Sequence, residues 1–265
     1  MHACVQGSEA TVFLMRDGVA VRRPRHPNAS LAMKERDALL LVSQHPNLVR
    51  ILSIENGVIH MERMHVSLQR HLPAGQAKAC PFHIKLHIAL AVAQGMHHLH
   101  THGMDHGDIC PSNILLACTP GKMPVKLCDF YSENNGIRRT AAYASPEVVI
   151  APKRTMCPAD VWALACCILF LEGVEPFSGF QEDHAKFFYL GLHQCVAFQE
   201  ADGPKQFRLQ DCEHAPARHI GGTLWAHMLH GMFAPEALRP TSQQVLDRLR
   251  KMRALKTRVP LRRVN

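Results

Sequence analysis

The sequence has little of what marks a membrane, secreted or repetitive protein. Its longest uninterrupted apolar run, Val161–Leu171, is 11 residues long, whereas a span across a bilayer needs roughly 18. The first residues show no basic stretch followed by an apolar run, which is the pattern of a secretory signal. Internal repeats and low-complexity linkers are missing too. We therefore expect a protein that works inside the cell, in the cytoplasm, the nucleus or both, with no membrane partner.

Acidic residues are missing after Asp247. The chain has 30 Lys and Arg against 22 Asp and Glu, a net charge of +8. The excess comes from the basic residues that follow Asp247: Arg248, Arg250, Lys251, Arg253, Lys256, Arg258, Arg262 and Arg263. Because the rest of the chain is neutral, a nucleic acid or another anionic partner is not expected except at this tail. The tail partly continues the final predicted helix, which favours a solvated helix face over such a role.

Cysteine pairs of the CxxC type are also missing, although the chain has ten cysteines. Scattered cysteines favour a reducing compartment over a disulfide framework. Histidines are frequent between His97 and His106, but no HExxH motif or Cys/His ligand spacing accompanies them. Structural histidines are therefore a better interpretation than a metal site.

What the chain does have is a β-rich beginning. Its 265 residues, 47% of them hydrophobic, are sufficient for a substantial core. Asp17-Gly18 between two apolar runs predicts a β-hairpin, and His45-Pro46-Asn47 is expected to end a helix. The elements predicted for this part are strands at Ala10–Met15, Val19–Val21, Leu48–Ile54 and Gly57–Met61, and a helix at Ser30–Ser43.

A long helical part follows Pro81, where apolar residues recur at spacings of three and four. The predicted helices are Phe82–His102, Pro158–Leu171, Leu224–Phe233 and Thr241–Leu255. The composition changes near Glu62–Val66, which is the candidate boundary between the two parts. The sequence therefore predicts an α+β protein.

Two carboxylates and an amide are the candidates for chemistry. Asp108 and Asn113 lie five residues apart in a proline-containing loop between the first two large helices, and Asp129 ends a short predicted strand. Hard oxygen ligands of this kind suit Mg²⁺, which proteins bind through one or two carboxylates together with substrate phosphates. Phosphoryl transfer uses such a set, because it depends on positioning and on neutralising charge. A loop-capping role for Asp108 and Asn113 is the alternative.

At these residues the sequence resembles the eukaryotic protein-kinase family, and the resemblance continues in order over nearly the whole chain. The segments that match family motifs are Val5–Val12 (glycine-rich loop), Val19–Arg22 (lysine strand), Glu35 with His45–Val49 (regulatory helix and its end), His106–Leu116 (catalytic loop), Asp129–Tyr131 (Asp-Phe-Gly), Thr140–Glu147 (substrate-binding segment), Asp160–Trp162 (buried helix) and Arg239-Pro240 (late arginine).

The resemblance implies a bilobal kinase-like fold of the α+β class, with a small β-rich N-lobe that contains one helix and a larger, mainly helical C-lobe. The kinase domain is expected over residues 1–247, with the N-lobe at about 1–63 and the C-lobe at about 64–247. A basic C-terminal tail over residues 248–265 would follow.

The resemblance also implies roles for single residues. Asp108 would accept or orient the proton of the substrate hydroxyl, while Asn113 and Asp129 would hold Mg²⁺, or Mn²⁺ in its place, on the phosphates of ATP. Thr140, in a Thr-x-x-Tyr arrangement, resembles the substrate segment of serine/threonine kinases. The residues implied in nucleotide binding are Gly7, Val12, Ala20, Arg22 and Glu35.

Two structural contacts are implied as well. The buried helix that starts at Asp160 would anchor the catalytic loop, and Arg239 would pair with Glu147.

Five departures from the family pattern bear on activity. Gly7 is the one glycine left of three in the nucleotide loop, so backbone amides would approach the phosphates less closely. Arg22 replaces a lysine that serves as a compact point charge, and Cys110 replaces a lysine near the transferred phosphoryl group. Gly107 replaces the arginine that would bind a phosphate on the activation segment, so activity is not expected to depend on that switch. Tyr131 replaces a glycine and restricts backbone rotation.

The predicted function is thus ATP-dependent phosphorylation of serine or threonine in a protein substrate. The alternative is a pseudokinase that acts as a protein-binding module, as the losses at the nucleotide site would allow. A small-molecule phosphotransferase is less favoured, because Thr140–Glu147 resembles a segment that seats a peptide. Cys110 could be a reactive thiol rather than a small buried side chain. The lysine-free catalytic loop is also similar to that of the divergent kinases encoded by herpesviruses.

Overall fold

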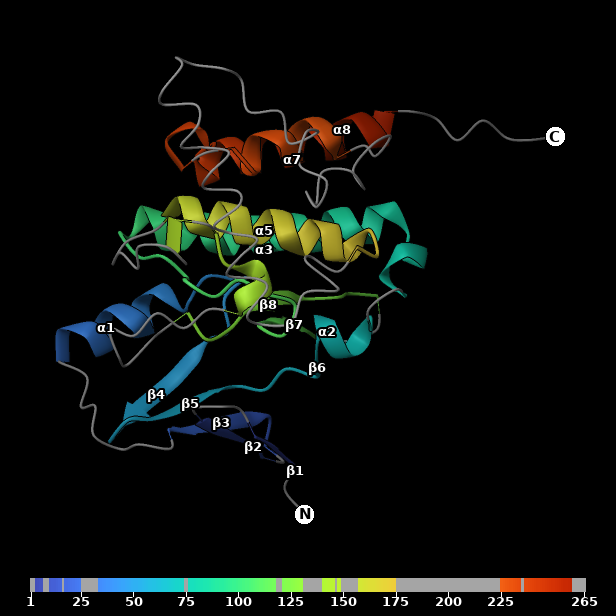
Figure 1. Cartoon of the computed structure of the whole chain (residues 1–265). Coiled ribbons are helices and arrows are strands. Elements are labelled where there is room, and N and C mark those ends of the chain that lie inside the picture. The colour runs from blue at the N-terminus through green and yellow to red at the C-terminus, as the bar shows by residue number, and fades with distance from the viewer. Residues whose placement is uncertain are drawn as a thin grey trace.

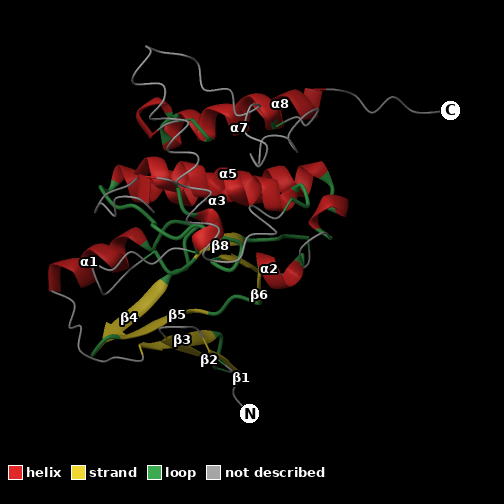
Figure 2. Ribbon diagram, in the orientation of Figure 1, coloured by secondary structure: helices red, strands yellow, loops and turns green. Residues whose placement is uncertain are grey.

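The computed structural model describes residues 3–6, 10–15, 17–24, 33–73, 76–117, 121–130, 140–145, 147–148, 157–174, 225–234 and 236–258. In Figure 1, strands β1 to β5 lie at one end of the molecule and helices α7 and α8 at the other, with the long helices α3 and α5 between them. Figure 2 shows the same separation of strands from helices by colour.

An antiparallel sheet of five strands, in the order β1-β2-β3-β5-β4, forms the first part of the fold. The strands are β1 (Ala3–Gln6), β2 (Ala10–Leu14), β3 (Val19–Pro24), β4 (Ile51–Glu55) and β5 (Val58–Glu62). The predicted hairpin at Asp17-Gly18 is confirmed, since β2 and β3 pair antiparallel. Asp17 supports the turn by accepting a hydrogen bond from the N–H of Val19 (3.2 Å). The sequence prediction missed β1, whose four residues are too few to show an alternating pattern.

The helix described in this part is α1 (Met33–Val42), within the range predicted for it. The strand predicted at Leu48–Ile54 is wrong at its start, because β4 begins at Ile51. Leu48 and Val49 instead join the opposite part of the molecule: Leu48 forms a parallel bridge with Leu127, and the N–H of Val49 donates to the Leu127 carbonyl oxygen (2.8 Å). This short pairing connects the β-rich part to the helical part.

Helix α3 (Phe82–Thr101) packs closely under that connection. A Cβ atom at Gly95 would lie 2.8 Å from the carbonyl oxygen of Asn47, closer than side-chain carbons approach a backbone oxygen. Glycine at this position therefore lets α3 lie directly against the turn that follows α1.

A three-stranded sheet, in the order β6-β7-β8, lies between the two parts. Its strands are β6 (Val66–Ser67), β7 (Ile114–Leu116) and β8 (Val125–Leu127). Helix α2 (Leu68–His71) contacts β6 and β7. The short helices η1 (Ala77–Ala79) and η2 (Ala141–Tyr143) contact α5. Strands β7 and β8 carry the loops that hold Asn113 and Asp129, so this sheet fixes their separation.

Three further helices confirm the predicted positions to within about three residues: α5 (Cys157–Leu171), α7 (Ala226–Met232) and α8 (Ser242–Arg258). The short helix η5 (Glu236–Leu238) was not predicted. Every residue of α5 from Ala159 to Leu171 is buried, which explains its all-round apolar sequence. Helix α8 lies along α3 on the outer side of the molecule.

The predicted α+β class is confirmed, with an antiparallel sheet in the first part and helices in the second. No helix among the described residues is long and apolar enough to cross a bilayer. The division into residues 1–63, 64–247 and 248–265 stays a prediction, although α8 continues past Asp247 as far as Arg258.

Candidate active site

The catalytic loop is anchored by Asp160, at the start of the buried helix α5. The Asp160 carboxylate accepts hydrogen bonds from the backbone N–H groups of His106 (2.7 Å) and Gly107 (2.9 Å), and from Nε2 of His100 (3.0 Å). Burial alone would raise the pKa of Asp160, but the hydrogen bond and charge of His100, together with His106, outweigh burial and lower it. The predicted anchoring contact is therefore confirmed, and Asp160 stays ionised.

Gly107 takes a left-handed backbone conformation, with φ +79°. Glycine adopts this conformation without steric cost, whereas other L-residues are strained in it. The turn aims the next residue, Asp108, back toward the loop, where its N–H donates to Nδ1 of His106 (3.2 Å). Gly107, which replaces the arginine of the family pattern, thus also fits the left-handed backbone at this position.

Asp108 and Asn113 are in direct contact. Nδ2 of Asn113 donates to both the carbonyl oxygen (2.9 Å) and the carboxylate Oδ2 (3.0 Å) of Asp108. Both partners can only accept, so the –NH₂ group of Asn113 must face Asp108 and its Oδ1 must point the other way. The amide therefore holds the carboxylate in place and directs an oxygen toward whatever lies opposite.

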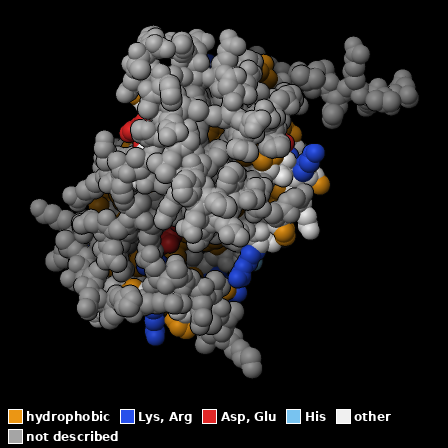
Figure 3. Space-filling model, viewed as in Figure 1, with side chains coloured by type: hydrophobic (Ala, Val, Ile, Leu, Met, Phe, Trp, Pro, Cys, Tyr) orange, Lys and Arg blue, Asp and Glu red, His pale blue; other side chains and the backbone are white. Residues whose placement is uncertain are grey.

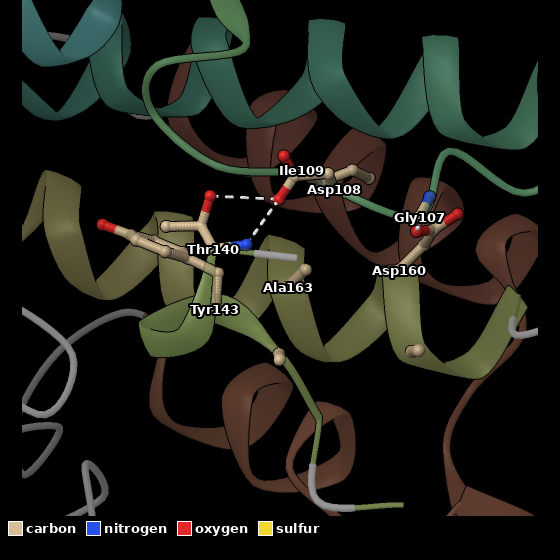
Figure 4. Close-up of a pocket in the computed structure, with 9 residues that line it drawn as sticks. Gly107, Asp108, Ile109, Thr140, Tyr143, Asp160 and Ala163 are labelled. Carbon is tan, nitrogen blue, oxygen red and sulfur yellow. Dashed lines mark hydrogen bonds between the residues drawn. The ribbon is translucent and has the colours of Figure 1, made fainter. Parts of the chain in front are cut away.

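Thr140 contacts the other oxygen of the same carboxylate, as the dashed lines in Figure 4 show. Its N–H (2.8 Å) and its Oγ1 (3.1 Å) both donate to Oδ1 of Asp108. Oγ1 also lies 3.4 Å from Sγ of Cys110. The residue predicted to belong to the substrate segment thus lies beside the predicted base.

A small cavity opens next to this contact, lined among others by Gly107, Thr140, Tyr143 and Ala163. Its volume is about 10 Å³, roughly the space of one water molecule. A nucleotide needs a far larger cleft, so this cavity is not the nucleotide site.

Asp129 follows strand β8 and also has a left-handed backbone, with φ 61°. Its Oδ1 lies 3.3 Å from Nε of Arg22, whose side chain is 7% exposed while that of Asp129 is 33% exposed. The next residue toward β8, Cys128, donates its N–H to the carbonyl oxygen of Asn113 (3.0 Å). Asp129 is therefore held near the catalytic loop by backbone hydrogen bonding and is linked by charge to the N-terminal sheet.

The predicted nucleotide residues Val12, Ala20 and Arg22 share one face of that sheet. Val12 is the direct cross-strand partner of Arg22, and Ala20 precedes Arg22 by two residues, so the alternation of side chains places all three together. Gly7 lies outside the described residues. Glu35 belongs to the described backbone of α1, but its side chain lies outside the description.

The residues that are present fit a divalent cation. Asn113 Oδ1 and the Asp129 carboxylate are hard oxygen donors, and the orientation of the Asn113 amide leaves its oxygen turned away from Asp108. The two residues are joined through the Cys128–Asn113 backbone hydrogen bond. The guanidinium of Arg22 beside Asp129 opposes a cation there.

Two thiols adjoin these groups and both are expected to be neutral. Burial and the charge of Asp108 raise the pKa of Cys110, against the hydrogen bonds from Ser112 and Thr140. Burial raises the pKa of Cys128 well above its ordinary value, with further contributions from Asp129 and Cys110. Because Cys110 is only 1% exposed, these facts argue against the reactive-thiol alternative.

The predicted pair of Arg239 with Glu147 is confirmed. The guanidinium binds both carboxylate oxygens, with Nη2 to Oε2 at 2.8 Å, and it lies 5.0 Å above the ring of Trp162. Burial would raise the pKa of Glu147, but the hydrogen bonds and charge of Arg239 lower it. The end of the substrate segment is thereby fixed to the helical core.

Two contacts were missed by sequence reasoning. It assigned Arg22 to nucleotide binding and did not foresee its ion pair with Asp129, and it did not foresee that Cys110 would touch Thr140. Opposite charge was the only available signal for the first contact, and none existed for the second. Tyr131, the predicted departure after Asp129 and Phe130, lies outside the described residues.

Several of the histidines make contacts within the fold. His100 bonds Asp160, His98 stacks on His45, and the ring of His102 lies tilted against that of His98. Within the described part of the chain, no group of three or more His, Cys, Asp or Glu side chains is placed to hold a metal ion.

Comparison with known proteins gives a consistent result. A family model described as protein kinase domain matches residues 7–252. Three similar proteins are "Mitogen-activated protein kinase mpkC" of Aspergillus terreus, "Sporulation protein kinase mde3" of Schizosaccharomyces pombe and "Protein kinase MCK1" of Saccharomyces cerevisiae, each 26% identical, over 193, 202 and 173 residues. The alignments cover 67%, 64% and 54% of this chain but 50%, 36% and 45% of those proteins. The chain thus spans half or less of their length.

Proposed function

The chain belongs to the protein kinase family, and from this premise we propose that it transfers the γ-phosphoryl group of ATP to serine or threonine side chains of a protein substrate. Protein substrates and ATP are general to the family. The choice of serine or threonine rests on Thr140, which lies against Asp108 as part of the segment that would seat a peptide.

One observation carries the proposal, namely the convergence of Asp108, Asn113 and Asp129. The side-chain amide of Asn113 donates to the Asp108 carboxylate. The backbone carbonyl oxygen of Asn113 accepts a hydrogen bond from the N–H of Cys128, the residue before Asp129. The three side chains come from two separate stretches of chain, the loop that holds Asp108 and Asn113 and the residues that follow β8. Their combined chemistry is that of phosphoryl transfer.

Each side chain has a separate role. Asp108 accepts the proton of the attacking hydroxyl. Asn113 and Thr140 fix the orientation of the Asp108 carboxylate through three hydrogen bonds. Asn113 Oδ1 and Asp129 would hold Mg²⁺, or Mn²⁺, which when bound neutralises the phosphate charge. Val12 and Ala20 would cover the base of the nucleotide on the sheet side.

A pseudokinase is the second candidate, and a specific observation favours it. Arg22 is paired with Asp129 rather than standing free to bind phosphate, and the thiol of Cys110 contributes no positive charge near the transferred group. In that case the chain would bind nucleotide or partner proteins without turnover. A similarity to divergent herpesvirus kinases remains a prediction from the catalytic loop.

An assay of purified protein with radiolabelled ATP, basic protein substrates and Mg²⁺ or Mn²⁺ tests the proposal. We expect Asp108→Asn to lower phosphate incorporation by about 10²-fold, the scale of a lost general base. Asp247→Asn, at an exposed carboxylate on α8, is the matched control and should keep wild-type activity.

Equal and minimal incorporation by wild type and Asp108→Asn would contradict the enzymatic proposal. A thermal-shift titration with ATP then separates the alternatives, because a nucleotide-binding pseudokinase gains stability from the ligand by mass action. A partner that is a nucleic acid is expected only at the basic tail, because the rest of the chain has no net charge. On the face in Figure 3, the Lys and Arg side chains that are described lie at separate points.

A further inference from the structure

Arg22 and Asp129 form an ion pair at the point where the N-terminal sheet meets the strand β8 loop. Nε of Arg22 lies 3.3 Å from Oδ1 of Asp129. The Arg22 side chain is 7% exposed, so little solvent is available to screen its charge. Asp129 is the carboxylate assigned above to a divalent cation, and it therefore already has a cationic neighbour.

The identity of that neighbour matters. A guanidinium keeps its proton under all ordinary conditions, whereas a lysine ammonium is a compact charge on a flexible stem that can turn away. A divalent cation bound by Asp129 would lie close to the fixed positive charge of Arg22 and would be repelled by it. The same guanidinium can contact phosphate oxygens bidentately. Arg22 therefore weakens the cation at Asp129 and supplies positive charge that the cation would otherwise bring.

The two neighbouring cysteines add no cationic group to that of Arg22. Cys128 adjoins Asp129, and Cys110 stands in the place of a lysine. Arg22 is thus a positive charge in direct contact with the Asp129 carboxylate, and the geometry of this contact supports the inference.

We propose that Arg22 takes over part of the electrostatic role of the divalent cation at Asp129, so that ATP binds this chain with little dependence on Mg²⁺. The inference rests on the proposed function, because it requires the same cleft to hold the nucleotide. It concerns binding and not the rate of transfer.

Binding of a fluorescent ATP analogue to the full chain, measured in EDTA and in millimolar Mg²⁺, tests this inference. For the wild type we expect the two dissociation constants to differ by less than about 3-fold, and for Arg22→Lys by more than about 10-fold. Arg23→Lys is the matched control. It makes the same change one residue along β3, where Arg23 is exposed and lies over the ring of Phe13, and it should behave as wild type.

A second variant guards against misfolding of Arg22→Lys. Asp129→Asn removes the negative charge that pairs with Arg22, so the guanidinium can contact the phosphates of ATP instead. In EDTA, this variant should therefore bind ATP more tightly than the wild type does. Weaker binding of ATP to Asp129→Asn in EDTA, wild-type binding that requires Mg²⁺, or an unchanged Mg²⁺ dependence in a folded Arg22→Lys each overturns the inference while leaving the proposed function intact. Failure of every protein to bind ATP, with and without Mg²⁺, overturns both.

Discussion

Gly107 replaces an arginine of the family pattern and also has a left-handed backbone conformation. With φ at +79° and the nearest atom to an added Cβ, Asp105 Oδ2, at 3.8 Å, a side chain would fit but its backbone would be strained. We expect Gly107→Ala to lower the free energy of unfolding by about 1 kcal/mol. Denaturant unfolding followed by circular dichroism measures this change.

Gly107→Asn separates strain from volume, because asparagine is larger than alanine yet adopts left-handed conformations more readily. The asparagine variant should be the more stable of the two. A greater loss for asparagine than for alanine would show that space, and not φ, limits this position.

Sequence alone could predict which residues lie near one another where this depends on spacing along the chain. Asp108, Asn113 and Asp129 stand at fixed intervals in a loop and after a strand, and the structure brings them together. The partner of Arg22 could not be identified in this way. A long cationic side chain can reach several carboxylates, and only the three-dimensional packing of β3 against the β8 loop decides which one it meets.

At the scale of elements, a column of histidine rings joins the turn after α1 to helix α3. His45 and His98 stack with ring centroids 4.5 Å apart, and His102 continues the column at 4.4 Å from His98. Burial, with the nearby charges of His98 and Lys126, lowers the pKa of His45 to about 4. Burial and His102 lower the pKa of His98 as well. His45 and His98 are therefore neutral near pH 7.

This column predicts a loss of stability in mild acid. The unfolded chain takes up protons on these histidines below about pH 6.5, whereas the folded chain resists protonation of His45 down to about pH 4. Stability should therefore be full above pH 6.5 and fall as the pH drops toward 4. Because His45 is only partly buried, we expect a contribution of about 1–2 kcal/mol. Chemical denaturation at pH 7 and pH 5 measures it.

His45→Gln should flatten this dependence, while His83→Gln, at an exposed histidine at the start of α3, should not. The carboxylates with lowered pKa, Asp160 and Glu147, lose their contributions only as the pH falls through the range below their ordinary values, so the two effects separate on the pH axis. Parallel pH profiles for wild type and His45→Gln would refute the assignment.

Long helices with a regular apolar spacing were predictable from sequence. Short segments that pair with residues far away in the sequence were not. The apolar spacing of α3 and α5 gives their bounds almost to the residue. Leu48 and Val49 have the composition of a strand, yet they pair with Leu127 across the molecule and not with β5. Local propensity cannot reveal which partner a short apolar segment will meet.

At the scale of the whole molecule, long-range contacts tie the substrate segment and the catalytic loop to one buried core. Arg239 binds Glu147 from just before α8 and lies over Trp162 of α5, and Asp160 of the same helix holds the catalytic loop. Helix α5 thus supports both segments, and a change in its packing would displace residues of the candidate site. Because α8 packs against α5, loss of α8 would disturb the site as well.

The extent of the folded unit gives the last prediction. The expected boundary after Asp247 falls inside α8, where Leu249 is fully buried and Leu255 is 66% exposed. If the fold includes the helix beyond 247, Leu249→Ala should lower the free energy of unfolding by about 2–4 kcal/mol, because it leaves a cavity against the core. Leu255→Ala, the same change two turns later, should alter it by less than about 0.5 kcal/mol. Thermal and denaturant unfolding measure both variants. Equal and small changes in the free energy of unfolding would show that residues 248–258 belong to the tail and not to the folded domain.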